Sequence, residues 1–148
     1  MDIKFVVIIQ CDIARLRCSG FACTKCFYDR EGFFKDCGYP HGTRYIAFTC
    51  GGCCGGSIAS HLEHFSNKLA RQTDLKKDEV AVHIASCMAT DNYHHDRCPN
   101  LEYIKGIIRK KGYKNIVGGT FRSDNATKKR KAGIYKDYEL ETFCGAEE

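Results

Sequence analysis

The chain of 148 residues lacks any stretch of the roughly 20 consecutive apolar residues that a membrane-spanning helix requires. A short apolar segment lies at residues 3–9, but neither a basic leader nor a small-residue cleavage site accompanies it. Internal repeats and low-complexity segments are also missing. We therefore expect a soluble, cytoplasmic protein that has no membrane partner.

A concentrated basic surface is missing as well. The net charge is +5, and the 23 basic residues are spread along the chain. The one basic run, residues 128–131, lies in a tail that also carries six acidic residues. This balance is typical of a solvated tail, so a nucleic-acid partner is not expected. Nothing in the sequence indicates a protein partner.

Cysteine, by contrast, is abundant, with 11 residues. Because this number is odd, the chain cannot place every cysteine in an intramolecular disulfide, and at least one thiol stays free. The chain is also long enough to bury a core without cross-links. In a reducing compartment, clustered cysteines more often bind metal or take part in catalysis.

The apolar pattern predicts four strands and three helices. Residues 3–9 are apolar except for Lys4, which is typical of a strand that is covered on both faces. Further strands are expected at residues 45–49, 79–86 and 115–117. Helices are expected at residues 21–34, after an N-cap at Ser57, and from Cys98-Pro99 to Gly112. Alternating strands and helices predict an α/β fold with an open parallel sheet, flavodoxin-like, in the order 2-1-3-4.

We expect this α/β domain to span residues 1–120. Residues 121–148 lack a clear periodicity and are interpreted as a C-terminal extension that covers part of the sheet.

Residues 50–53, Cys-Gly-Gly-Cys, lie between a predicted strand and a predicted helix. Gly51 and Gly52 allow backbone conformations that a Cβ would forbid, so both sulfurs can point at one atom. The start of a helix also favours the thiolate over the thiol. This turn suits metal binding and disulfide exchange equally well.

Cysteine follows each of the first three strands, at Cys11, Cys50 and Cys87. The carboxyl ends of neighbouring parallel strands meet at one edge of a sheet, about 4.8 Å apart, so these side chains can converge. Clustered thiolates select zinc, cuprous copper or iron–sulfur clusters. We predict a bound metal, zinc first and an iron–sulfur cluster second, held by Cys11, Cys50, Cys53 and Cys87, with Cys98 as a substitute or fifth ligand.

The remaining cysteines and histidines are weighed separately. Cys18, Cys23 and Cys26 form a second group that makes a second metal site, shares the first, or packs in the core. His83, on a buried strand, is expected to be a core histidine with satisfied ring nitrogens. The adjacent His94 and His95 point apart, so at most one is expected to bind metal. Surface positions are expected for His41 and His64, and positions outside the site for Cys37, Cys54 and Cys144.

The sequence contains the Cys-Gly-Gly-Cys turn, Cys11, Cys18 and Cys23, the His-Ile-Ala-Ser-Cys segment at residues 83–87, and Cys98-Pro99. This combination resembles the CGGC-domain family. The resemblance extends from about residue 3 to residue 120. It implies a prokaryotic metal-binding protein whose role is inferred from shared cysteines and histidines. In this chain Cys54 stands where the family usually has proline.

Two other functions use the same cysteines. A strand, Cys-x-x-Cys and a helix also suit a thiol–disulfide oxidoreductase that cycles Cys50 and Cys53. The segment from Cys11 to Arg17 fits Cys-x5-Arg and resembles low-molecular-weight phosphatases and arsenate reductases, although the bulky Ile13 and Leu16 do not suit an oxyanion cradle. A metal carrier or sensor would use the same ligands as a metalloenzyme, so the sequence leaves open whether the protein is an enzyme.

Overall fold

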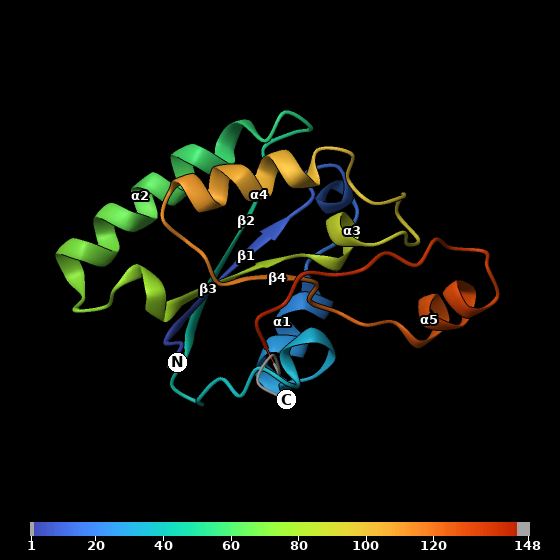
Figure 1. Ribbon diagram of the computed structural model, residues 1–148, viewed down its shortest axis with the longest axis horizontal. Coiled ribbons are helices and arrows are strands. Elements are labelled where there is room, and N and C mark those ends of the chain that lie inside the picture. Colours follow the sequence, from blue (N-terminus) through green and yellow to red (C-terminus); the bar gives the residue numbers. More distant parts are fainter. Residues whose placement is uncertain (1, 145–148) are drawn as a thin grey trace.

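The structure is a computed structural model that describes residues 2–144. Its four strands form one parallel sheet in the order β2-β1-β3-β4 (Figure 1). The strands are β1 (Phe5–Gln10), β2 (Arg44–Thr49), β3 (Val80–Ile84) and β4 (Ile116–Gly118). The predicted α/β class and strand order are therefore confirmed.

Helices cover both faces of the sheet. In Figure 1, α2 (Gly56–Gln72) and α4 (Leu101–Lys110) lie on one side and α1 (Phe21–Asp29) on the other. Successive strand residues point to opposite faces, so Val7 and Ile9 pack with the first pair of helices, whereas Val6 and Ile8 pack on the side of α1. All four of these side chains are fully buried, which explains the nearly unbroken apolar run of β1.

Several helix boundaries differ from the sequence prediction. The helix expected over residues 21–34 ends at Asp29 because Arg30 adopts a left-handed conformation with φ of 55°, and a short 3-10 helix, η2 (Gly32–Phe34), follows. The predicted N-cap at Ser57 is wrong: Gly55, with φ of 67°, caps α2.

Two segments after β3 also differ. Residues 86–89, expected as strand end and loop, form the short helix α3 (Ser86–Ala89). Helix α4 begins two residues after Pro99 rather than at Cys98-Pro99. The residues before the helix are held by other contacts, because the Cys98 N–H donates to the Met88 carbonyl and the Asn100 side chain donates to the Cys53 carbonyl. Two further 3-10 helices, η1 (Ala14–Leu16) and η3 (Lys77–Glu79), lie in loops.

The segment after β4 contains α5 (Asp124–Lys131), a helix that lies beyond α3 and away from the sheet (Figure 1). All of its eight residues except Ala126 are polar or charged and none is buried, so the helix shows no apolar periodicity. The chain then returns along β4, where the Gly118 N–H donates to the Glu141 carbonyl over 2.7 Å. The Glu141 carboxylate pairs with the buried Lys105 at 3.2 Å and with Arg109 at 2.6 Å, which joins this segment to α4.

Among residues 2–144, no helix combines the length and the apolar character needed to cross a membrane.

The packing of α4 on the sheet predicts the effect of a core truncation. Ile104 is 1% exposed, so Ile104→Ala should lower the free energy of unfolding by about 2–5 kcal/mol through lost apolar contact and the cavity that remains. Its neighbour Tyr103 is 65% exposed, and Tyr103→Ala should change this free energy by no more than about 0.5 kcal/mol. Urea unfolding of the three proteins measures both effects, and equal losses would contradict the assigned face of α4.

Candidate functional site

The Cys-Gly-Gly-Cys turn leaves the carboxyl end of β2. The Cys50 N–H donates to the Gln10 carbonyl of β1 over 2.9 Å, and the Cys50 carbonyl accepts from the Ser57 N–H over 3.3 Å. A Cβ at Gly51, where φ is 73°, would overlap the Ser57 side chain, so the turn needs glycine there. The turn therefore holds Cys50 buried, whereas Cys53 is exposed.

The cysteines that follow β1 and β3 lie at the same edge. Gln10 is paired with Thr49, so the next residues, Cys11 and Cys50, leave the sheet side by side. Cys87 lies in the first turn of α3, three residues after the end of β3. Cys98 approaches the same edge, because its N–H donates to the Met88 carbonyl over 2.9 Å.

Two of these thiols have raised pKa values, and burial is the main cause in both. Burial raises the pKa of Cys87 to about 12; a backbone hydrogen bond from Cys11 lowers it, and the thiolates of Cys11, Cys23 and Cys18 raise it further. Burial also raises the pKa of Cys98, with additions from the thiolates of Cys50, Cys11 and Cys53. Negative charge on one sulfur thus disfavours charge on the next, and a bound cation would relieve this repulsion.

The second group of cysteines divides. Cys18 and Cys23 line a cavity of about 420 Å³, together with Cys87 and His94. The Cys23 sulfur lies 3.2 Å from the Thr120 hydroxyl. Cys26 is 4% exposed and packs in the core on the α1 side of the sheet. Its role is therefore core packing rather than metal binding.

Within residues 2–144, no three side chains of Cys, His, Asp or Glu are arranged so that they could hold a metal ion. The thiols share one edge of the sheet without pointing at a common centre. Sulfur moves when a cysteine changes its χ1 rotamer, while the backbone stays in place. The donor set fits a soft metal in its chemistry, and its convergence would require such side-chain rotations.

The adjacent His94 and His95 point in different directions. The His95 Nε2 atom lies 3.2 Å from the Cys11 sulfur, and its Nδ1 atom lies 2.7 Å from the Asp96 carbonyl. A carbonyl accepts only from a protonated nitrogen, so Nδ1 carries a hydrogen, and Nε2 is the ring nitrogen that faces Cys11. The His94 Nδ1 atom is buried and has no hydrogen-bond partner among the described residues.

His83 is the core histidine that the sequence predicts. Its ring is fully buried, with one nitrogen 2.7 Å from the Tyr39 hydroxyl and the other 2.8 Å from the Gly119 carbonyl. Burial lowers the pKa of His83 to about 4, although the hydrogen bond to Gly119 raises it. His41 and His64 are exposed, as expected.

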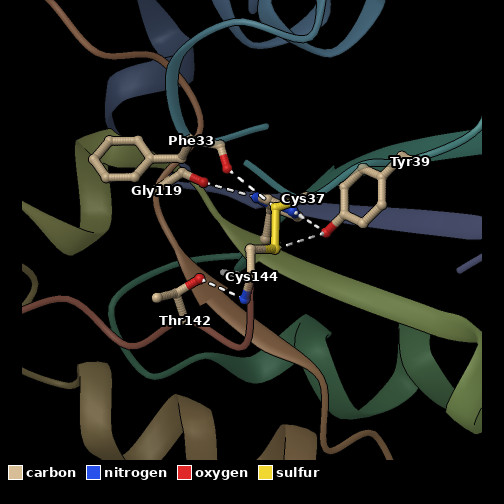
Figure 2. Close-up of a disulfide and its surroundings, with 7 residues drawn as sticks. Phe33, Cys37, Tyr39, Gly119, Thr142 and Cys144 are labelled. Atoms are coloured by element: carbon tan, nitrogen blue, oxygen red, sulfur yellow. Dashed lines mark hydrogen bonds between the residues drawn. A yellow bond between two sulfur atoms is a disulfide. The ribbon is translucent and has the colours of Figure 1, made fainter. Parts of the chain in front are cut away.

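Cys37 and Cys144 form a disulfide (Figure 2), which the sequence does not predict. The sequence predicts positions outside the metal site for Cys37, Cys54 and Cys144, and it predicts no bond between them; Cys54 is exposed and free. The two cysteines are 107 residues apart, and only the return of the chain past β4 brings them together. The Tyr39 hydroxyl lies 3.9 Å from the Cys144 sulfur, so the disulfide adjoins the partner of His83.

The Cys-x5-Arg segment does not form an oxyanion cradle. The N–H groups of Arg15, Leu16, Arg17 and Cys18 all donate to carbonyls within the segment, in and around η1. A phosphatase loop must instead direct its N–H groups toward the group that the thiolate attacks. This arrangement weighs against the phosphatase alternative that uses Cys11 and Arg17.

A family model described as the CGGC domain matches residues 5–121. All seven cysteines predicted as metal ligands lie in the matched region, which ends before α5 and Cys144. No curated protein and no solved structure matches the chain.

The low pKa of His83 predicts a loss of stability in acid. The ordinary pKa of histidine is 6.5, so below pH 6.5 the unfolded chain binds a proton at His83. The folded chain binds this proton only when the pH falls to about 4. The free energy of unfolding should therefore fall by about 3 kcal/mol between pH 6.5 and pH 4 through this residue. Urea unfolding across this range should show a smaller pH dependence for His83→Gln than for wild type. His64→Gln, which changes an exposed histidine, should keep the wild-type dependence; equal curves for all three proteins would contradict the assignment.

The disulfide predicts a redox-dependent stability. Cys37→Ser frees a closed loop of more than 100 residues, so without reductant the free energy of unfolding should fall by about 3–5 kcal/mol. With excess dithiothreitol the variant and the wild type should unfold alike. Cys54→Ser, at an exposed free thiol, is the matched control and should behave as wild type does. A Cys37→Ser protein as stable as wild type under oxidising conditions would rule out the cross-link.

Proposed function

The chain belongs to the CGGC-domain family, and from that premise we propose that it binds a soft metal through cysteines at the carboxyl edge of its sheet. The proposed metal is zinc, with an iron–sulfur cluster as the alternative. The proposed ligands come from Cys11, Cys50, Cys53, Cys87 and Cys98, while Cys18 and Cys23 are candidates for a second site or a share in the first.

One observation carries this proposal: free thiols from separate segments of the chain gather at one edge. Cys11, Cys50 and Cys87 follow three neighbouring strands, and none of them is in a disulfide. Burial raises the pKa values of Cys87 and Cys98, and negative charge on neighbouring sulfurs, including that of Cys11, raises them further. Such a site is unfavourable for several thiolates without a cation and favourable with one.

The contacts of His95 support it as an additional ligand. Its Nε2 atom lies 3.2 Å from the Cys11 sulfur, and the Asp96 carbonyl holds the opposite nitrogen. Metal-bound histidines characteristically donate their second ring nitrogen to a carbonyl or carboxylate in this way. A set of cysteines with one histidine suits zinc, whereas four cysteines suit either zinc or an iron–sulfur cluster.

The number of protein ligands separates a carrier from an enzyme. Four protein ligands close a tetrahedral site, and three leave a position for a substrate. This chain's own residues would position the sulfurs, and the buried Cys11 and Cys50 keep their part of the site away from water.

Thiol–disulfide exchange is the second candidate function, supported by the exposure of Cys53 above the buried Cys50. In this reaction two thiols become one disulfide, and a substrate disulfide takes up the two electrons and two protons. The wild-type protein would then contain little metal, and Cys53→Ser would abolish reduction of a small aromatic disulfide.

Elemental analysis and a visible spectrum of protein purified without oxygen test the metal proposal. Wild type should contain about one zinc ion per chain without colour, or iron with colour; Cys50→Ala should lose most of it, and Cys54→Ala should keep it. At metal concentrations about a thousand times the dissociation constant, a chelator should lower wild-type stability by about 4 kcal/mol and leave Cys50→Ala unchanged. Unaltered metal content in Cys50→Ala would refute the ligand assignment.

Two further expectations belong to this proposal. We assign residues 1–120 to the metal-binding domain and residues 121–148 to an extension. We also propose a cytoplasmic location, in which the Cys37–Cys144 disulfide would form only under oxidising conditions.

A further inference from the structure

The cavity of about 420 Å³ beside Cys87 is not explained by metal binding. Its volume lies within the roughly 300–1,000 Å³ that small-molecule sites occupy. One wall comes from α1, α3 and the loop that carries His94, all within the family match. The opposite wall comes from α5 and Tyr135, which lie outside that match (Figure 1).

The charge of this cavity has one sign. Lys129 and Arg130 line it, and none of its lining residues is a carboxylate. Neither cation takes part in an ion pair within residues 2–144. Positive charge on Arg17 also acts on His94, which lines the cavity. Burial is the main cause of the lowered pKa of His94, and the charge on Arg17 is the second.

Lys129 and Arg130, the two cations on α5, are held in place by contacts within the protein and still have N–H groups that can bind a ligand. One Arg130 nitrogen donates to the Asp91 carbonyl over 3.0 Å, which fixes the guanidinium at the cavity and leaves other N–H groups for a ligand. The Lys129 ammonium lies 5.1 Å from the centre of the Tyr135 ring. These donors are suited to a carboxylate, sulfonate or phosphate group.

The remainder of the lining is mostly apolar. Ala22 and Ala126 face the cavity from opposite walls. Phe121 and Tyr93, which also line it, are 42% and 80% exposed, so they can cover the body of a ligand. An inorganic ion would leave this surface unfilled, whereas an organic molecule would bury it.

We propose that this cavity binds a small organic anion, with its acidic group at Lys129 and Arg130 and its apolar body between α1 and α5. The C-terminal extension supplies the basic residues of the site, whereas Cys18, Cys23 and Cys87 line another part of the same cavity, so the proposed contacts to the acidic group use none of the candidate metal ligands.

Fluorescence titration with 8-anilinonaphthalene-1-sulfonate tests this site, and N-phenyl-1-naphthylamine is the uncharged control with the same aromatic body. Wild type should bind the sulfonate at least about tenfold more tightly than the amine. The double variant Lys129→Ala/Arg130→Ala should lose about tenfold in sulfonate affinity while its affinity for the amine stays unchanged. Lys128→Ala/Lys131→Ala removes the same charge from the same helix at residues that do not line the cavity, and it should bind as wild type does.

A second variant tests the cavity itself. Ala126→Trp should fill it and abolish the binding of both probes, while the near-ultraviolet circular dichroism of the protein stays native. Equal affinity for the two probes, or an equal loss in the two double variants, would overturn the proposal. Full displacement of the sulfonate by millimolar inorganic phosphate would also overturn it, since the site would then select a bare anion. Metal content should be the same in wild type and all three variants, so failure here is distinguishable from failure of the metal proposal.

Discussion

The structure depends on one constraint: the four strands run in the same direction, so all their carboxyl ends lie at one edge of the sheet. The fully buried residues of β1 hold this arrangement, because helices cover them on both faces. Cys11, Cys50 and Cys87, which lie far apart in the sequence, therefore share an edge. The same polarity places the loop of His95 and the Cys98 backbone beside them.

This shared edge gathers thiols but does not by itself coordinate a metal. Burial and, to a lesser extent, neighbouring thiolates raise the pKa values of Cys87 and Cys98, yet within residues 2–144 no three ligand side chains converge. The backbone brings the thiols near one another, and side-chain rotations would be needed to make them converge. Such an arrangement suits a site whose thiols must lose protons as the metal binds. His95 faces Cys11 through its Nε2 atom, because the Asp96 carbonyl holds its other ring nitrogen.

The C-terminal segment changes what surrounds that edge. Its α5 supplies the basic wall of the cavity, and its last described residues are joined to the domain by the Glu141 contacts and by the Cys37–Cys144 disulfide. The disulfide lies on the α1 side of the sheet beside Tyr39 (Figure 2), and the Tyr39 hydroxyl in turn contacts His83. Cysteine thus has two separate roles here: a cross-link on one face and free thiols at the strand ends.

The sequence by itself determined the strand order, the family and the strand-end positions of Cys11, Cys50 and Cys87, because apolar runs and Gly-rich turns are local signals. It also identified His83 as a core residue from its place in a buried strand. Only the tertiary structure decided that Cys37 meets Cys144, that His95 rather than His94 contacts Cys11, and that α5 closes a cavity. Those outcomes depend on contacts between residues 84 or more positions apart, or on a helix with no buried face, and neither leaves a periodic trace in the chain.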